Sequence, residues 1–310
     1  MLLGLAGDTM LGRAVAEAIA TTGPESLLAD EVVAVAQEAD LFVLNLECCI
    51  SERGEPWPDP AKPFFFRAPP AATDVLRRLG VDCVTLANNH ALDYGEDALV
   101  DTFEHLREAG VAWAGAGLDR EAARAPALLE VAGLRLAVVA CSDHPADYAA
   151  GEARPGIAYG LDWVPAGLAE VDADAVLVTP HWGPNMTAEP VAHVRRAADA
   201  LVEAGATLVA GHSAHVFHGV ERNVLYDLGD FLDDYAVQPV LRNDLGLLFL
   251  VELDRGGPGR LEAVPLELQY CHTRLARGAE AAWIHRRFTE ACRALGTEVT
   301  EERGRLVVEF

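Results

Sequence analysis

Residues 206–215 read ATLVAGHSAH, a short apolar run followed by a glycine-bearing turn that carries two histidines. The apolar run predicts a buried strand, and the turn places His212 and His215 just beyond its carboxyl end. Two imidazoles in such a position can hold a metal ion or move a proton. Because α/β proteins place their sites at the carboxyl ends of buried strands, this stretch indicates an α/β fold with a site at one sheet edge.

Four other apolar runs deliver polar side chains in the same way. They lead to Asp8 after residues 2–6, to Asn45 and Glu47 after 41–44, to Asn88, Asn89 and His90 after 83–86, and to His181 after 175–178. Carboxylates, amide oxygens and imidazoles form the ligand set of manganese, iron or zinc, as one ion or as a pair. Each residue alone also fits a structural role, such as a helix cap or a turn. Taken together, the five strand ends predict a metal-binding site.

Asp230 follows a further predicted strand at residues 223–228. A carboxylate at this point either orients an imidazole ligand of the metal or belongs to an acidic turn. Both interpretations stay open, because Asp227, Asp233 and Asp234 make the whole segment acidic.

Strand and helix patterns alternate along most of the chain, which predicts a largely parallel sheet covered by helices. A hairpin is expected at residues 128–141, and two longer strands, 245–253 and 260–268, flank a Gly-Pro turn. An amphipathic helix at 276–295 and an edge strand at 306–310 end the chain. We therefore expect an αββα sandwich in one domain, residues 1–310, with the C-terminal helix and strand (276–310) packed on the core.

The composition excludes several classes of function. The 310 residues are 51% hydrophobic and carry a formal net charge of -24, which argues against nucleic acid or an anionic membrane as a partner. The six cysteines form no Cys-x-x-Cys pair and suit reduced core thiols. We see no signal peptide and no membrane-spanning run, and so expect a cytoplasmic protein with a small-molecule or peptide substrate. Its oligomeric state stays open.

The segment Ser51–Pro70 carries six prolines and is too long for a simple connection. A long ordered loop of this kind is typical of a cover over a site, although it also suits a packing loop. The segment contains Lys62, the sole lysine of the chain, and Arg67. We expect these two cations to hold a substrate carboxylate or phosphate, and Trp182, next to His181, to contact the substrate.

Six motifs in chain order resemble those of one known family. They are GDTMLGR (7–13), NLE (45–47), LANNHALDYG (86–95), HWG (181–183), GHSAH (211–215) and GDFLDDY (229–235). This set resembles the CapA family, named for poly-γ-glutamate capsule biosynthesis and related to calcineurin-like metallophosphatases. The resemblance implies a metallophosphatase-like αββα fold with His90 as general acid. It also implies six metal ligands: Asp8, Glu47, Asn89, His181, His212 and His215. Asn88 and Asp230 would lie just behind them.

Two positions depart from the pattern of the dimetal phosphoesterases. Met10 stands where those enzymes have the histidine of Asp-x-His, and the last pair is His-x-x-His instead of His-x-His. The resemblance therefore implies that at least one metal position has lost a ligand. One ion, two ions and none all remain compatible with the sequence.

Three functions follow from these residues. The first is a metal-dependent hydrolase of an amide, γ-glutamyl or phosphoester bond, in which the bound ion activates water. The second drops the metal: Asp8, His90 and His215 act as an acid/base set of an isomerase or epimerase on a peptide substrate. The third is a non-catalytic accessory subunit of polymer biosynthesis, as in poly-γ-glutamate production.

Overall fold

Two β-sheets face one another in the computed structural model, which describes residues 1–310. The first sheet runs β19-β20-β17-β16-β1-β2-β5-β6, with β15 paired to β1 and β18 to β17. Its strands are β1 (Leu2–Thr9), β2 (Leu41–Leu46), β5 (Cys83–Thr85), β6 (Ala112–Ala114), β15 (Asp230–Leu232), β16 (Leu245–Asp254), β17 (Gly257–Gln269), β18 (His272–Leu275), β19 (Thr300–Glu302) and β20 (Arg305–Glu309).

The second sheet runs β13-β14-β12-β11-β9-β8. Its strands are β8 (Ala127–Val131), β9 (Leu134–Ser142), β11 (Ala175–His181), β12 (Leu208–Ala210), β13 (Val220–Glu221) and β14 (Val224–Leu225). In the first sheet β1, β2, β5 and β6 are parallel, whereas β16 pairs antiparallel with β1 and with β17. In the second sheet β9, β11 and β12 are parallel, and the predicted hairpin at 128–141 is the antiparallel pair β8–β9. Two short pairs, β3 (Cys49–Ile50) with β4 (Arg67–Ala68) and β7 (Ala116–Gly117) with β10 (Gly156–Ile157), lie outside the two sheets.

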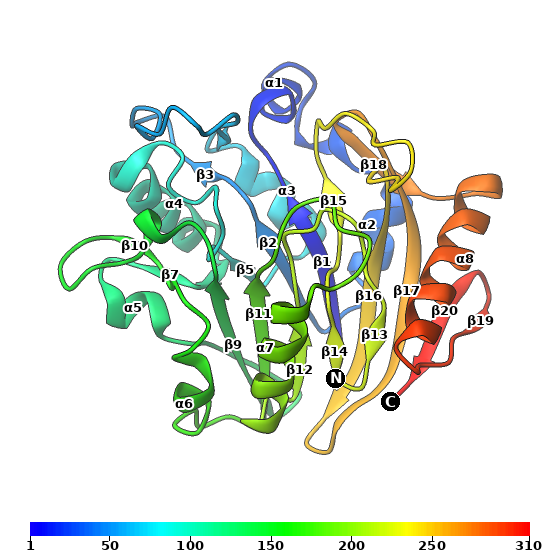
Figure 1. The fold of residues 1–310 in the computed structure, drawn as a ribbon. Coiled ribbons are helices and arrows are strands. Elements are labelled where there is room, and N and C mark those ends of the chain that lie inside the picture. Colours follow the sequence, from blue (N-terminus) through cyan, green and yellow to red (C-terminus); the bar gives the residue numbers. More distant parts are fainter.

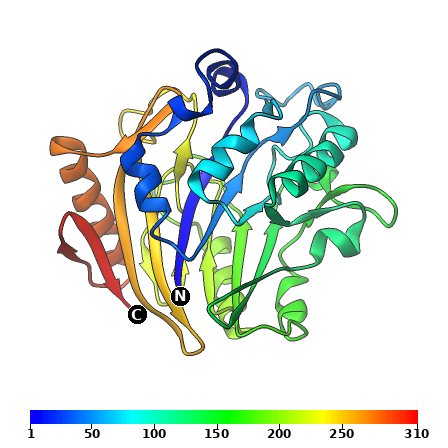
Figure 2. The same cartoon turned by 180° about the vertical axis from the view of Figure 1, so that it is seen from behind.

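Helices cover the outer faces of the sandwich, as Figures 1 and 2 show from the two sides. They are α1 (Arg13–Thr22), α2 (Asp30–Ala36), α3 (Ala72–Leu79), α4 (Gly95–Ala109), α5 (Arg120–Arg124), α6 (Val164–Leu168) and α7 (Ala192–Glu203), with 3-10 turns at Pro24–Leu27 and Ala146–Tyr148. The last helix, α8 (Gly278–Ala294), packs instead on the apolar layer between the sheets. Figure 2 shows α2, α3 and α4 in front of the first sheet, whereas α7 lies over the second sheet in Figure 1. The αββα prediction is confirmed.

Side chains that alternate along each strand enter two different apolar layers. On β2, Phe42 and Leu44 pack beneath the helices of the first sheet, whereas Leu41 and Val43 pack between the two sheets. Successive strand residues point to opposite faces, so a strand that is covered on both sides is apolar throughout. A third apolar cluster lies between the second sheet and α6 and α7.

The C-terminal segment adds to the sandwich at one end. Ile284, Phe288 and Cys292 of α8 belong to the apolar layer between the sheets. The sequence placed the last strand at a sheet edge, and this prediction is wrong: β20 pairs with β17 on one side and with β19 on the other. All three residues of β19 are exposed, so it lacks the apolar pattern of a strand. No helix combines the length and the apolar character that crossing a bilayer requires.

Candidate functional site

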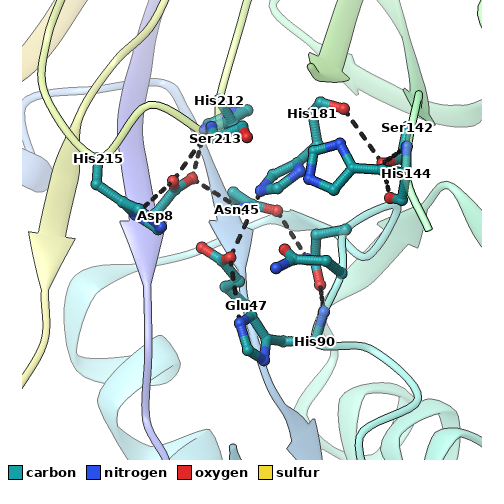
Figure 3. Close-up of polar contacts among 12 residues, drawn as sticks. Asp8, Asn45, Glu47, His90, Ser142, His144, His181, His212, Ser213 and His215 are labelled. Atoms are coloured by element: carbon teal, nitrogen blue, oxygen red, sulfur yellow. Dashed lines mark hydrogen bonds and ion pairs between the residues drawn. The ribbon is translucent and has the colours of Figure 1, made fainter. Parts of the chain in front are cut away.

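Strand register brings the predicted site residues to one place. Asp8 on β1 lies opposite Asn45 on β2 and opposite Asp230 on β15. In the second sheet His181, at the end of β11, forms a β-bridge with His212. Figure 3 shows Asp8, Asn45, His181 and His212 converging from both sheets, with Asp8 and Glu47 between the histidines.

Close backbone approaches fix the turns that carry these residues. A Cβ atom on Gly7 would lie 1.8 Å from the carbonyl oxygen of Gly229, so only glycine fits beside β15. The approach lets the Asp8 amide donate to that same oxygen at 2.9 Å. In the next turn Ser213 and His215 have φ angles of +108° and +59°. Such left-handed non-glycine residues concentrate at functional sites.

Asp8 is the hub of the site and is fully buried. Its Oδ1 accepts from Asn45 Nδ2 at 2.8 Å and lies 3.0 Å from His212 Nδ1. Its Oδ2 accepts from the Ser213 amide at 3.3 Å and lies 3.3 Å from His215 Nδ1. Burial by itself raises the pKa of Asp8, but the two imidazoles outweigh it and hold this pKa well below its usual range. Asp8 is therefore a carboxylate.

His215 lies between two carboxylates. Its Nδ1 is 2.8 Å from Asp230 Oδ1, in addition to its contact with Asp8. Burial opposes a charge on the ring, but Asp230 and Asp8 together raise the pKa of His215 well above its usual value. Asp230 Oδ2 is buried and has no hydrogen-bond partner. One carboxylate oxygen thus remains free to bind a cation.

Glu47 and His181 are buried without partners. Neither oxygen of Glu47 and neither ring nitrogen of His181 makes a hydrogen bond, and His181 Nε2 lies 3.5 Å from Glu47 Oε1. Burial raises the pKa of Glu47 well above its usual range and lowers that of His181 well below. Unpartnered polar atoms in a protein interior carry a large desolvation cost. A cation bound between them removes that cost.

The donors form two groups that share Asp8. Ligand atoms of Asp8, Glu47 and His181 lie within 4.8 Å of one another, and so do those of Asp8, His215 and Asp230. Carboxylate oxygens with imidazole nitrogens are the donor set of divalent transition metals. The residues present therefore fit a divalent ion at this site.

His90 lies at the rim of the metal-ligand groups. Its Nδ1 is 2.6 Å from Asp93 Oδ2, and its Nε2 is 3.9 Å from Glu47 Oε1. Burial lowers the pKa of His90, although Asp93 acts in the opposite direction. The Asn88 side chain accepts from the His90 amide at 3.0 Å and donates to Asn45, so it fixes the turn that presents the ring.

Of the two positions that decide how many metal ligands the chain offers, Asn89 has a usable donor atom and Met10 does not. Asn89 is half-buried, and its side-chain oxygen is buried without a partner. It lines the cavity described below and is available as a ligand. Met10 is fully buried in the apolar layer of the first sheet, so position 10 offers no donor.

A cavity of about 620 Å³ opens beside His90 and His215. It is lined by Arg13, Lys62, Pro63, Phe64, Asn89, His90, Asn185, Met186, His215, Asp234, Tyr235 and Ala236. Lys62 lies here as expected, but its ammonium already donates to the Asn89 carbonyl at 2.7 Å and pairs with Asp93 at 3.0 Å.

Arg67 and Trp182 do not line this cavity. The Arg67 guanidinium stacks on Tyr94 and donates to the carbonyls of Arg53 and Gly54, which directs it away from the site. Trp182 is buried in the outer layer of the second sheet, and its indole donates to Tyr226. The positions of both side chains argue against the expected contact with substrate.

Two functional candidates were missed by the sequence reasoning. Asp93 accepts from the Phe66 amide, from Tyr148 and from Lys62 while it holds His90. The spacing His90-x-x-Asp93 was a usable signal, because residues three apart share one face of a turn. Arg13, within the first motif, lines the cavity although sequence reasoning gave it no role.

The sequence of this chain matches a known family. Residues 2–235 match the family model described as bacterial capsule synthesis protein. A probable polyglutamine synthesis accessory protein of Mycobacterium tuberculosis is 31% identical over 84% of this chain and 74% of its own length. A PGA biosynthesis protein CapA of Bacillus subtilis is 27% identical over 84% of this chain and 70% of its own length.

Solved structures share the fold. A phosphatase from Mycoplasma pneumoniae superposes with a TM-score of 0.56 at 12% identity, covering 86% of this chain and 93% of its own. A putative 5′-nucleotidase from Staphylococcus aureus superposes with a TM-score of 0.51 at 13% identity, covering 89% of this chain and 54% of its own. By sequence, this chain belongs to the CapA family of bacterial capsule synthesis proteins and has a metallophosphatase-like fold.

Proposed function

We propose that this protein is a metal-dependent hydrolase that cleaves an amide, γ-glutamyl or phosphoester bond. The observation that carries the proposal is the pair Glu47 and His181, whose four side-chain donor and acceptor atoms are buried without a partner. A protein that only needed this fold would gain stability by replacing both residues with apolar ones. Their presence is explained by a bound cation.

The ion would be manganese, iron or zinc, held as one ion or as a pair. Asp8, Glu47, His181 and His215 contribute carboxylate oxygens and imidazole nitrogens from the two ligand groups. Outside these groups, His212 is proposed to add an imidazole beside Asp8, and Asn89 an amide oxygen that has no other partner. Asp230, expected behind the ligands, has a free oxygen beside His215 and joins this set. A divalent ion in such a site lowers the pKa of water and offsets the charge that develops in the transition state.

His90 is proposed to protonate the leaving group. Its ring lines the cavity, and its Nδ1 is fixed by Asp93, which leaves Nε2 free to face the substrate. The Asp93 carboxylate opposes the lowering of the His90 pKa by burial, and so favours the protonated ring that an acid requires. The substrate is proposed to be a small molecule or peptide, since the charge of -24 disfavours nucleic acid.

The scissile bond is suggested by two sets of relatives. Curated relatives are described by polyglutamine synthesis and PGA biosynthesis, which favours an amide or γ-glutamyl bond. Proteins of similar fold are described as a phosphatase and a nucleotidase, which favours a phosphoester. Both bonds need an activated water and an acid for the leaving group.

Metal binding can be tested without a substrate. We expect Mn²⁺ or Zn²⁺ to raise the melting temperature of chelator-treated protein. When the ion is present at 100 times its Kd, the free energy of unfolding should rise by about 2.7 kcal/mol. Glu47→Gln and His181→Ala should lose most of this gain, whereas Arg67→Met should keep it. Equal melting curves with and without metal for the wild type would refute the metal site.

Catalysis is tested separately with a phosphodiester and a γ-glutamyl anilide. In metal-loaded protein, His90→Asn should lower kcat by about 10²–10⁴-fold while the metal content measured by elemental analysis is unchanged. Metal-loaded protein that cleaves neither bond would favour the accessory role over the hydrolase.

A further inference from the structure

Arg13 is held at the wall of the active-site cavity by three neighbours. Its Nε pairs with Asp234 Oδ2 at 3.2 Å, and its guanidinium lies 4.9 Å from the ring centre of Phe64 and 5.3 Å from that of Phe66. Asp234 also accepts from the amide of Ala14, so it is fixed to the start of α1. The carboxylate sets the orientation of the guanidinium, and the two rings set its plane.

This arrangement leaves donors of Arg13 unused. The ion pair with Asp234 is the only polar side-chain interaction that Arg13 makes, and its Nη1 is buried without a hydrogen-bond partner. The side chain is still 33% exposed, and it lines the cavity. Because Asp234 engages only Nε, the terminal nitrogens keep their N–H donors, and the exposed part of the guanidinium can meet a planar anion in the cavity.

The other cations near the site lack this freedom. The Lys62 ammonium is 11% exposed and is bound by Asp93 and the Asn89 carbonyl. Arg67 lies outside the cavity and donates to backbone carbonyls. Of the arginine and lysine side chains that line the cavity, Lys62 uses two of its three N–H donors, whereas Arg13 uses only the Nε donor of its five.

Arg13 shares an aromatic wall with the reacting groups. The ring of Phe66, which packs on the guanidinium, also contacts His90 edge-to-face at 4.5 Å. The Tyr235 ring lies 5.9 Å from Phe66 and 5.3 Å from His215. An anion on Arg13 is thus one ring away from the proposed acid, His90, and two rings away from a proposed metal ligand, His215.

We propose that Arg13 binds an anionic group of the substrate, a carboxylate or a phosphate, next to the bond that is cleaved. The proposal rests on the proposed hydrolase function and deepens it, because it assigns the anion contact first expected of Arg67. A net charge of -24 repels anions at long range, so a local guanidinium is needed to hold one. Asp234, Phe64 and Phe66 are the residues that position it.

The test measures anion binding without turnover. Inorganic phosphate and N-acetylglutamate are titrated into purified protein by calorimetry, for the wild type, Arg13→Met, Arg13→Lys and Arg67→Met, with the metal content of each measured. We expect Arg13→Met to weaken binding of at least one anion by about tenfold or more, the loss of one charge-assisted contact. Arg13→Lys should restore part of it, and Arg67→Met should bind as the wild type does.

Each outcome decides the proposal. Phosphate binding that depends on Arg13 identifies a phosphoester substrate, and N-acetylglutamate binding that depends on it identifies a carboxylate substrate. Wild-type protein that binds neither anion, or Arg13→Met that binds both with unchanged affinity and metal content, overturns it. If Arg13→Met fails to fold, Arg13→Lys and Arg13→Gln carry the comparison. The binding experiment measures no hydrolysis, so it is independent of the activity test. If the protein proves inactive in that test but its anion binding depends on Arg13, the hydrolase proposal is refuted and the anion site is retained.

Discussion

Replacing Lys62 with methionine should destabilise the protein through a single buried ion pair. The ammonium lies 3.0 Å from Asp93 Oδ1, the carboxylate is fully buried, and the lysine is 11% exposed. The substitution keeps the apolar stem of the side chain and removes the ammonium, with its charge and its hydrogen bond to the Asn89 carbonyl. It leaves Asp93 with its other donors, which are His90, Tyr148 and the Phe66 amide.

The magnitude follows from the burial of this pair. Removing one partner of a buried pair costs about 3–5 kcal/mol, and the remaining donors place Lys62→Met near about 3 kcal/mol. An unfolding entropy of about 2.1 cal/mol/K per residue gives about 0.65 kcal/mol/K for 310 residues, so Tm should fall by about 5 °C. The substitution also removes contacts between the loop Ser51–Pro70 and the turn that carries His90, because Lys62 binds the Asn89 carbonyl and Asp93.

The assay is calorimetric melting, with Arg77→Met as the matched control. Arg77 pairs with Asp74 at 2.7 Å, but these side chains are 46% and 54% exposed, so this control should lose less than about 1 kcal/mol. Because Lys62 is the sole lysine, its acetylation by an amine reagent can be read from one peptide, and Asp93→Asn should accelerate it. If Lys62→Met and Arg77→Met lower Tm equally, and the rate of Lys62 acetylation is unchanged in Asp93→Asn, the ion-pair argument is refuted.

Two further predictions concern backbone fit and pH. Gly7→Ala should cost about 3 kcal/mol or more in urea unfolding, because its Cβ would lie 1.8 Å from the Gly229 carbonyl, whereas Gly259→Ala, with open space around it, should be nearly neutral. The hydrogen bond from Arg53 lowers the pKa of Asp101, so the pair stabilises the protein above the usual Asp pKa of about 3.9, and this contribution disappears as pH falls through the lower folded-state pKa. Asp101→Asn should therefore lower the urea midpoint at neutral pH and matter less in acid; a pH-independent difference would contradict this assignment.

The sequence predicted the two-sheet fold and the gathering of site residues because both depend on strand patterns. Asp8, Glu47 and His181 each follow an apolar run, and parallel strands bring their carboxyl ends to one edge. Strand β20 was misplaced because its outer neighbour, the fully exposed β19, has no apolar signal. A polar edge strand is held by backbone pairing, which a side-chain pattern does not reveal.

The substrate contacts were harder to predict because they depend on side-chain direction. Successive residues at a strand end point to opposite faces, so when His181 enters the site, Trp182 must turn into the outer core. That rule could have excluded Trp182. No comparable rule separates Arg67 from Arg13, because their directions are set by Tyr94 in one case and by Asp234 in the other, partners that are distant in sequence or known only after folding.

The departure at position 10 has a structural explanation that also bears on the metal. Met10 is buried in the outer apolar layer, so a histidine there would replace core packing unless the strand shifted. On the other side of β1, strand β15 runs parallel to it and sets Asp230 opposite Asp8, within 2.8 Å of His215. Asp230 keeps one oxygen without a partner. The donor absent from the first motif is thus matched by a carboxylate from the last motif, and the site keeps two overlapping ligand groups around Asp8.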